Sequence, residues 1–354
     1  MTERLTDIEN KIYSQYEKAR EQQAPRTHLG GSGIGHECHR KIWYEYRWCE
    51  TKKKPGRLLR LFDHGQKEEA RVIADLRAAG LDVLDLDPST GKQWAFVDAA
   101  SGLSGSLDGV VVMPVPGGEP TYALLEIKTH NEKSFKDLEK KGVAKAKPLH
   151  LAQMHTYMGL AGLEFALYFA VNKNTDDLYI EWISFDAQQF EWHKETARKV
   201  IGSRDPPERV SKDPAFFVCK FCDFSALCWG SAVARPSCRT CMRYERGTCG
   251  LDGRELGAAF QVGGCVDHAY VPDLIGFAEV VGAENATLKY RNKLTDHKFW
   301  NVPGTMFPVP ENSYSSEEIY SMEPLAVGDP AVGRAKRVLG GTAGGVGREP
   351  GQDG

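Results

Sequence analysis

Hydrophobic and polar residues follow two different periods along the first half of the chain, and these periods predict the order of helices and strands. Apolar side chains recur at helical spacing near the N-terminus, at Leu5, Ile8, Ile12 and Tyr16. Two further helices are predicted over residues 36–48 and 57–79. The glycine at position 80 suits the left-handed cap that ends many helices.

Apolar runs bounded by turn sequences predict strands in the next part of the chain. The first four runs begin at Leu81, Gln93, Gly105 and Tyr122, and segments rich in Pro, Gly and Ser separate them. The runs FALYFAV and DLYIEWISF predict two more strands further along.

The segments between these strands predict the architecture. A lysine-rich loop is expected from Asn131 to Lys147, then a helix from about Leu149 to Leu160, and another helix from about Ala187. This order of helix, several strands, helix and strands predicts an α/β fold with a mixed central sheet flanked by helices.

The overall composition permits one sizeable core with a smaller module beside it. The chain has 354 residues, of which 41% are hydrophobic, and a net charge of −3. It has no general basic character, so any contact with nucleic acid must come from local patches. The charged N-terminus lacks an apolar signal segment, and no run approaches the roughly 20 apolar residues of a membrane span, so we expect a cytoplasmic protein.

The composition changes after Asp205-Pro-Pro, where Cys and Gly become frequent. We therefore expect a core domain over residues 1–230 and a small cysteine-bearing module over 231–323. The Gly-rich end, 324–354, has little to bury and predicts a disordered tail. Nine cysteines in a reducing compartment, several of them in C-x2-C pairs, indicate metal ligation in place of disulfides.

Three chemically active side chains lie in or beside two apolar strands. Asp108 lies in GSLDGVVV, while Glu126 and Lys128 lie in LLEIKT. Side chains two residues apart in a strand point to the same face, so Glu126 and Lys128 face the same way. Burying such charges is costly, and the cost is tolerable where carboxylates hold a hard divalent cation such as Mg²⁺ or Mn²⁺.

This group of residues suits the hydrolysis of a phosphodiester. Asp108, Glu126 and the carbonyl of Ile127 would hold the metal ion, which lowers the pKa of a bound water. Lys128 would orient that water or stabilise the negative charge that develops on the phosphate.

The order of these motifs resembles the PD-(D/E)xK nuclease superfamily and its RecB-like branch, which implies a restriction-endonuclease-like core. D-G and E-I-K resemble the second and third motifs, with Ser-Leu-Asp in place of the nominal Pro-Asp. HGQKEEARVI resembles the first motif, in which Glu69 would be a metal ligand and Glu68 or His64 are alternatives. Gln153 and Tyr157 match the Q-x3-Y motif and share a helix face, from which they would contact substrate phosphate or the active-site lysine.

Four cysteines extend this resemblance over roughly residues 30–230. They are Cys38 and, in VCKFCDFSALCWG, Cys219, Cys222 and Cys228. Their arrangement resembles the iron-sulfur nucleases related to AddB and to the CRISPR-associated RecB-like exonucleases, which implies a structural 4Fe-4S cluster that closes a long loop. A zinc ion bound by the same four thiolates is the alternative.

A second group of metal-binding residue types lies between positions 238 and 268. It contains Cys238, Cys241, Cys249, Cys265 and His268. The four cysteines are the expected ligands of a structural zinc ion, and His268 is a substitute for any one of them.

The resemblance implies a Mg²⁺- or Mn²⁺-dependent DNA exonuclease of bacterial or phage origin, acting in recombination, repair or phage DNA metabolism. Two basic runs, 52–60 and 133–147, are candidate contacts to DNA phosphates. A helicase or recombination protein is a candidate partner, because the chain lacks the Walker A sequence of a motor. The alternatives are a catalytically idle DNA-end-binding subunit of a helicase-nuclease assembly, and a metal-binding scaffold whose acidic group is coincidental.

Overall fold

The computed structural model describes residues 6–23, 26–49, 53–113, 119–284, 287–306 and 309–339. The chain divides into two compact units. The first unit comprises residues 1–37 and 53–199, and the second comprises 38–52 and 200–354. Residues 38–52 and 200–230, which we expected in the core domain, therefore group with the C-terminal half of the chain.

A mixed five-stranded sheet forms the centre of the described part of the first unit. Its strands, in spatial order, are β10 (Leu178–Ser184), β9 (Phe165–Asn172), β8 (Thr121–His130), β7 (Gly109–Met113) and β2 (Asp82–Leu84). Strands β8 and β9 run parallel, and the other neighbouring pairs run antiparallel. The predicted α/β class, with a mixed sheet flanked by helices, is confirmed.

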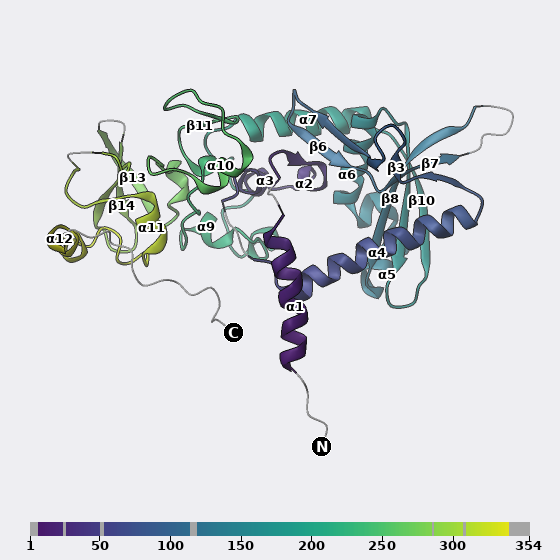
Figure 1. Ribbon diagram of the computed structural model, residues 1–354, viewed down its shortest axis with the longest axis horizontal. Coiled ribbons are helices and arrows are strands. Elements are labelled where there is room, and N and C mark those ends of the chain that lie inside the picture. Colours follow the sequence, from purple (N-terminus) through teal and green to yellow (C-terminus); the bar gives the residue numbers. More distant parts are fainter. Residues whose placement is uncertain are drawn as a thin grey trace, which may run out of the picture. The chain divides into compact units, whose positions relative to one another are not determined.

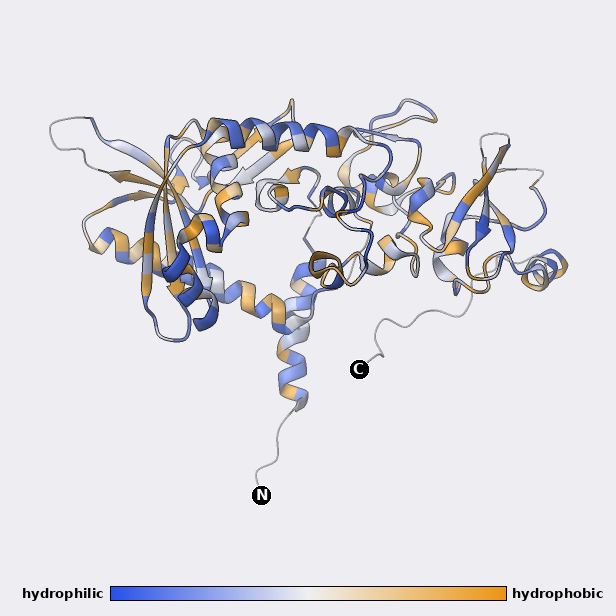
Figure 2. Ribbon diagram, turned by 180° about the vertical axis from the view of Figure 1, so that it is seen from behind, coloured by the Kyte–Doolittle hydropathy of each residue, from blue (hydrophilic) through white to orange (hydrophobic). Residues whose placement is uncertain are grey.

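Helices cover both faces of this sheet (Figure 1). Helix α4 (Gly56–Ala78) packs Val72, Ile73 and Leu76 against one face. Helices α5 (Glu132–Ala146) and α6 (Pro148–Ala161) pack against the other. Figure 2 shows the strands of the sheet mainly in the hydrophobic colour, as expected for a sheet buried on two sides. After α4, Gly80 adopts a positive φ of 88°, as its position predicted.

The predicted loop from Asn131 to Lys147 is wrong, because α5 occupies this segment. Asn131 caps the helix by accepting a hydrogen bond from the backbone N–H of Ser134 at 2.8 Å. Phe135 and Leu138 are buried against the sheet. Lysines along the helix form ion pairs four residues apart, such as Lys136 with Glu132, so the lysine-rich composition is compatible with an amphipathic helix.

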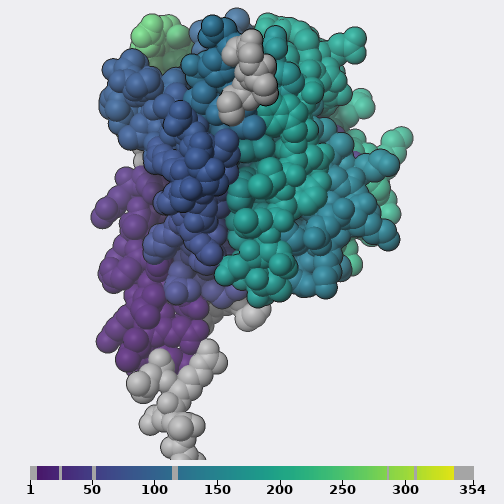
Figure 3. Space-filling model, turned by 90° about the vertical axis from the view of Figure 1, so that its right-hand side faces the viewer, coloured from purple at the N-terminus to yellow at the C-terminus, as the bar shows by residue number. Residues whose placement is uncertain are grey.

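Smaller elements complete the first unit. They are α1 (Thr6–Glu21), β1 (Leu29–Gly30), α2 (Gly31–Ile34), β3 (Leu86–Asp87), β4 (Lys92–Gln93), β5 (Ala95–Asp98), β6 (Leu103–Ser106) and α7 (Ala187–Gly202), whose last residues belong to the second unit. Helix α1 lies alongside α4, and the two are adjacent in Figure 3. Glu17 accepts a hydrogen bond from the backbone N–H of Gly56, which fixes α1 to the first residue of α4. No helix among the described residues is long and apolar enough to span a membrane.

The second unit begins with short helices and turns and ends in a four-stranded sheet. The helices and turns are α3 (His39–Tyr46), α8 (Phe217–Lys220), α9 (Ser225–Trp229), η1 (Cys238–Thr240), α10 (Ala258–Gly263) and η2 (Pro272–Leu274). The short strands β11 (Tyr244–Glu245) and β12 (Thr248–Cys249) form a hairpin. The sheet consists of β13 (Ala278–Glu284), β14 (Thr287–Asn292), β15 (Lys298–Asn301) and β16 (Ser313–Tyr314).

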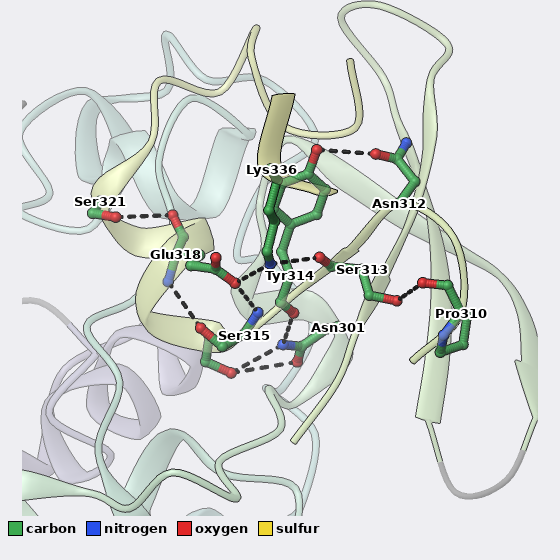
Figure 4. A network of polar contacts seen from close by, with 10 residues as sticks. Asn301, Pro310, Asn312, Ser313, Tyr314, Ser315, Glu318, Ser321 and Lys336 are labelled. Carbon is green, nitrogen blue, oxygen red and sulfur yellow. Dashed lines mark hydrogen bonds and ion pairs between the residues drawn. The ribbon is translucent and has the colours of Figure 1, made fainter. Parts of the chain in front are cut away.

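Part of the predicted disordered tail is ordered. Helices α11 (Ser316–Ser321) and α12 (Pro330–Leu339) follow the sheet, and α12 lies within the expected tail of residues 324–354. Lys336 of α12 donates to Glu318 and to the Ser313 carbonyl, at 2.7 and 2.9 Å (Figure 4). The expected tail therefore starts too early at residue 324. Polar contacts such as those of Lys336 order residues beyond this point, although these residues have few apolar side chains to bury. Residues 340–354 of the expected tail lie outside the described residues.

Candidate functional site

The pairing of β7 with β8 brings Asp108 next to the strand that carries Glu126. Gly109 stands opposite Leu125 in this antiparallel pair, and Asp108 directly precedes β7. The Oδ2 atom of Asp108 accepts a hydrogen bond from the backbone N–H of Ile127 at 2.8 Å. The hydrogen bond holds one carboxylate oxygen at a defined place beside β8.

Glu126 and Lys128 point to the same face of β8, as their spacing predicted, and form an ion pair. The Glu126 side chain is 1% exposed and that of Lys128 is 27% exposed. The Oε1 atom of Glu126 contacts the Lys128 ammonium and accepts a hydrogen bond from it. A buried carboxylate held by a single ammonium is a chemically suitable ligand for a hard cation.

Among the three first-motif alternatives, Glu69 is the residue that faces this group. Its carboxyl group interacts with Asp108 and Lys128, and burial together with the Asp108 charge raises the pKa of Glu69 to about 7. Glu68 instead lies 3.4 Å from the guanidinium of Arg71. His64 is exposed on the same helix.

Burial also dominates the electrostatics of the other three charged groups. It raises the pKa of Glu126 to about 7 against the opposing effect of Lys128, and it raises the pKa of Asp108 as well. Burial alone lowers the pKa of Lys128, but the Glu126 and Asp108 carboxylates outweigh it and raise this pKa above its ordinary value. Three carboxyl groups thus converge on one ammonium ion, a concentration of perturbed groups that is typical of functional sites.

Tyr157 of α6 reaches the same group of residues. Burial and then the charge of Glu126 raise the pKa of Tyr157 to about 12, and its side chain is 5% exposed. Two glycines make room for its ring, because a Cβ atom would lie 2.5 Å from it at Gly31 and 2.0 Å at Gly105. Gln153 is half-buried one turn earlier in α6, and no polar contact of its side chain is seen.

A polar network beside Glu126 was missed by the sequence analysis. Tyr168 of β9 stands next to Glu126 in the parallel pairing of β8 with β9. The Tyr168 hydroxyl contacts Nε2 of His130 at 2.9 Å and Nδ1 of His150 at 2.8 Å. The period-two series Glu126, Lys128, His130 was the one available signal, since all three residues point to the same face of the strand.

The donor set of the acidic group suits a hard divalent cation. Glu69, Asp108 and Glu126 supply carboxylate oxygens, and the Ile127 backbone runs between them. In the arrangement seen, no three or more His, Cys, Asp or Glu side chains among the described residues form a group that could hold a metal ion. Glu126 is directed at Lys128, and this contact would have to open for a cation to be bound.

The four cysteines of the predicted iron-sulfur set line one cavity in the second unit. They are Cys38, Cys219, Cys222 and Cys228. Cys38 directly precedes α3, and a turn places Cys222 near Cys219, whose carbonyl accepts its N–H at 3.1 Å. Arg40, Lys41 and Arg209 also line the cavity, so positive charge surrounds a place where thiolates would be negative.

The predicted basic runs are partly neutralised by acidic neighbours. Lys53 pairs with Glu21 at 2.8 Å, and Lys141 of α5 pairs with Asp137 at 2.6 Å. Lys52 lies outside the described residues. A cavity beside α4 is mainly basic, with Asp63 as its acidic member. The cavity is lined by Tyr16, Arg57, Arg60, Leu61, Asp63, His64, Lys67 and Lys173.

Comparison with known proteins gives resemblance at the level of structure. No family model matches the chain, and no curated protein sequence matches it. The structure of SSO0001 aligns with 63% of this chain and 96% of its own, at 14% identity and a TM-score of 0.41. The alkaline exonuclease LHK-Exo from Laribacter hongkongensis aligns with 53% of this chain and 90% of its own, at 16% identity and a TM-score of 0.34. The structure of LHK-Exo in complex with dAMP also aligns with 53% of this chain and 90% of its own, at 15% identity and a TM-score of 0.35.

Proposed function

We propose that this chain is a Mg²⁺- or Mn²⁺-dependent DNA exonuclease that acts in recombination, repair or phage DNA metabolism. The observation that carries the proposal is the convergence of Glu69, Asp108 and Glu126 on Lys128, with Glu126 buried against the ammonium. The composition of this group, three hard anionic ligands and one fixed cation, suits a phosphodiester better than an uncharged substrate.

A bound Mg²⁺ or Mn²⁺ ion would supply a Lewis acid and lower the pKa of a water molecule. Glu69, Asp108 and Glu126, with the Ile127 carbonyl, are the residues that would hold it. Asp108 is positioned in advance, because the backbone N–H of Ile127 fixes its second oxygen. Glu126 becomes available when Lys128 turns from it toward the substrate.

Lys128 then acts on the phosphate. Its raised pKa keeps the side chain protonated, so the ammonium stabilises the negative charge on the phosphorus oxygens as a water oxygen attacks. The new P–O bond forms as the bond to the leaving sugar oxygen breaks. The attacking water gives up one proton to solvent, and the leaving alkoxide takes one up from solvent. Tyr157 and Gln153, on one helix face, orient Lys128 or a neighbouring phosphate.

We also propose that the four-cysteine cavity of the second unit holds a 4Fe-4S cluster. Four thiols lining one cavity match the number of ligands that such a cluster needs, and the basic lining offsets its negative charge. The role is structural, because Cys38 lies far from the other three in sequence and the cluster would restrain the intervening chain. Zinc bound by the same thiolates remains the alternative, and broad visible absorption of anaerobically purified protein distinguishes the two.

Degradation of end-labelled DNA tests the catalytic proposal. The wild-type chain is expected to release nucleotides with Mg²⁺ or Mn²⁺, while Asp108→Asn and Lys128→Ala abolish this release. Asp176→Asn is a matched control, because Asp176 is an exposed turn residue with a φ of 62° that asparagine readily adopts. Equal activity in all four proteins would remove the proposed catalytic role.

A second function is favoured by one specific observation. Lys128 already neutralises the charge of Glu126. In this second function the acidic group around Lys128 is catalytically inactive, and the chain serves as a DNA-end-binding subunit beside a helicase or recombination protein. This function predicts DNA binding without cleavage at any divalent-ion concentration. The same end-labelled DNA, followed by binding and by product release, separates the two functions.

A further inference from the structure

The segment around Cys238 and Cys241 in the second unit has the backbone geometry of a metal-binding turn. The backbone N–H of Cys241 donates to the Cys238 carbonyl at 3.1 Å across η1. The backbone N–H groups of Ala269 and Arg243 lie near the Cys241 sulfur, although burial raises the pKa of this thiol above its ordinary value. Backbone N–H groups directed at a sulfur stabilise a thiolate, which is the form of cysteine that binds metal.

Two other cysteines come into the same neighbourhood from separate segments. The hairpin of β11 and β12 places Cys249 opposite Tyr244 and against Cys238 in one small apolar cluster. Cys265 follows α10, and the groups that act electrostatically on Cys238 include Cys265, Cys241 and Cys249. Four thiols from three segments of the chain thus approach one another, although the described residues do not place them at metal-bonding geometry.

His268 lies in the same turn as Cys265, because its backbone N–H donates to the Cys265 carbonyl at 3.1 Å. Its Nε2 atom lies 3.1 Å from the hydroxyl of Thr240, and its side chain is 3% exposed. His268 stays the alternative to any one of the four cysteines as a zinc ligand.

The charges around the four cysteines complement a tetrathiolate centre. Arg254 acts on Cys238 and Arg243 acts on Cys241, so two guanidinium groups lie near sulfurs that would carry a net negative charge with Zn²⁺. Burial of the four sulfurs is uneven, since Cys238 and Cys241 are buried whereas Cys265 is exposed.

We infer that Cys238, Cys241, Cys249 and Cys265 bind one structural Zn²⁺ ion. The inference is independent of the nuclease proposal and of the cluster proposed at Cys38. Four sulfur ligands with no open position are typical of a structural and not a catalytic zinc site.

The zinc ion would fix the turn that holds Arg239. This side chain is 1% exposed and lies between the two cysteines of the turn in sequence. Its guanidinium lies 3.9 Å from the Trp48 ring centroid and donates to the Tyr46 carbonyl at 2.7 Å. A buried guanidinium needs such partners, so loss of the metal should loosen the contact between η1 and the end of α3.

Zinc content of the purified chain provides the first test. We expect one zinc ion per chain in the wild type and in Cys219→Ser/Cys222→Ser, and none in Cys238→Ser/Cys241→Ser. His268→Asn should keep its zinc. Zinc content that Cys238→Ser/Cys241→Ser leaves unchanged would overturn the assignment.

Alkylation of the wild-type protein tests the same assignment without a variant that could misfold. Cys265 is exposed, so without metal it should react with iodoacetamide quickly. We expect peptide mass spectrometry to find Cys265 protected before zinc chelation and modified after it, together with Cys249. Equal labelling of Cys265 before and after chelation, or a disulfide among the four cysteines, would contradict a zinc site.

Discussion

The side chain of Asp108 accepts a hydrogen bond from the backbone N–H of Ile127. This bond links the segments that carry Asp108 and Glu126 at the point where the two carboxylates meet. A single N–H···O bond of 2.8 Å joins the residue before β7 to the middle of β8. Asp108 therefore keeps its orientation even while Glu126 contacts Lys128. The first metal ligand is set by the fold, and the second depends on a side-chain rearrangement.

Glu69 and Glu68 provide a neighbouring pair of residues with different surroundings. Glu69 faces Asp108 and Lys128, whereas Glu68 lies 3.4 Å from Arg71. We expect Glu69→Gln to lower kcat/KM by at least about 100-fold, because a ligand of the divalent ion is lost. Glu68→Gln should change kcat/KM by less than about threefold. Initial rates measured across a Mn²⁺ titration check both values.

The same titration separates loss of metal affinity from loss of chemistry. Glu69→Gln should recover part of its activity at high Mn²⁺, since a weakened site fills by mass action. If Glu68→Gln is the more damaging change, the assignment of the first motif must move to Glu68.

The ion pair of Glu126 and Lys128 should dominate the stability of the site without metal. Lys128→Met leaves a carboxylate that is 1% exposed without its cation, and we expect the free energy of unfolding to fall by about 3 kcal/mol. Glu126→Gln/Lys128→Met removes both charges and should recover more than half of that loss. Urea denaturation without added divalent ions measures the free energy of unfolding of the four proteins in this double-mutant cycle. They are the wild type, Glu126→Gln, Lys128→Met and the double variant.

Lys67 is a suitable control for that cycle. It pairs with Asp63 at 2.7 Å in α4, but its side chain is 73% exposed. Solvent screens exposed pairs of this kind, so Lys67→Met should have little effect on the free energy of unfolding. A Lys128→Met variant as mild as Lys67→Met would mean that water reaches Glu126 in solution.

The predicted and observed sites differ where a contact depends on the pairing of strands that lie far apart in the sequence. The shared face of Glu126 and Lys128 follows from the period of a strand, so a local pattern was sufficient. The contact of Tyr168 with His130 depends on the parallel register of β8 with β9, to which no local pattern points. The lysines of α5 favour a loop prediction, whereas the cap at Asn131 and the buried side chains of Phe135 and Leu138 stabilise a helix there.

His193 should make the stability of the first unit dependent on pH. Burial lowers its pKa to about 4, from an ordinary value near 6.5. The unfolded chain therefore takes up a proton before the folded chain does, so this contribution is complete above pH 6.5 and is lost as the pH falls toward 4. We expect a decrease of at most about 2 kcal/mol between pH 7 and pH 5 from this group. Urea midpoints at several pH values measure it.

The variant His193→Gln should reduce that pH dependence. Thr156 donates its hydroxyl proton to the Ala152 carbonyl at 2.8 Å, so Nδ1 of His193 must donate to the Thr156 oxygen at 3.0 Å. The glutamine amide can provide a similar donor without titrating. His64→Gln, at an exposed position, should leave the slope unchanged. An unaltered slope in His193→Gln would assign the acid sensitivity to other groups.

Replacement of glycine by alanine should have opposite effects on stability at Gly105 and at Gly65. At Gly105, a Cβ atom would lie 2.0 Å from Cε1 of Tyr157, so Gly105→Ala must displace the ring or the strand. We expect a loss of about 1–3 kcal/mol in the free energy of unfolding, together with at least a tenfold fall in nuclease activity. At Gly65, within α4, the nearest atom is Thr129 Oγ1 at 4.0 Å, and Gly65→Ala should add about 0.5–1 kcal/mol.

Thermal unfolding and end-labelled DNA measure these two effects, and Tyr157→Phe isolates the hydroxyl group. If the hydroxyl acts on Lys128 or on phosphate, Tyr157→Phe should lose activity with little change in stability. If the ring serves only as packing, Tyr157→Phe should match the wild type while Gly105→Ala fails in both measurements. The charges of Glu126 and Lys128 both act on the pKa of Tyr157, so its hydroxyl lies near them and we expect the first result.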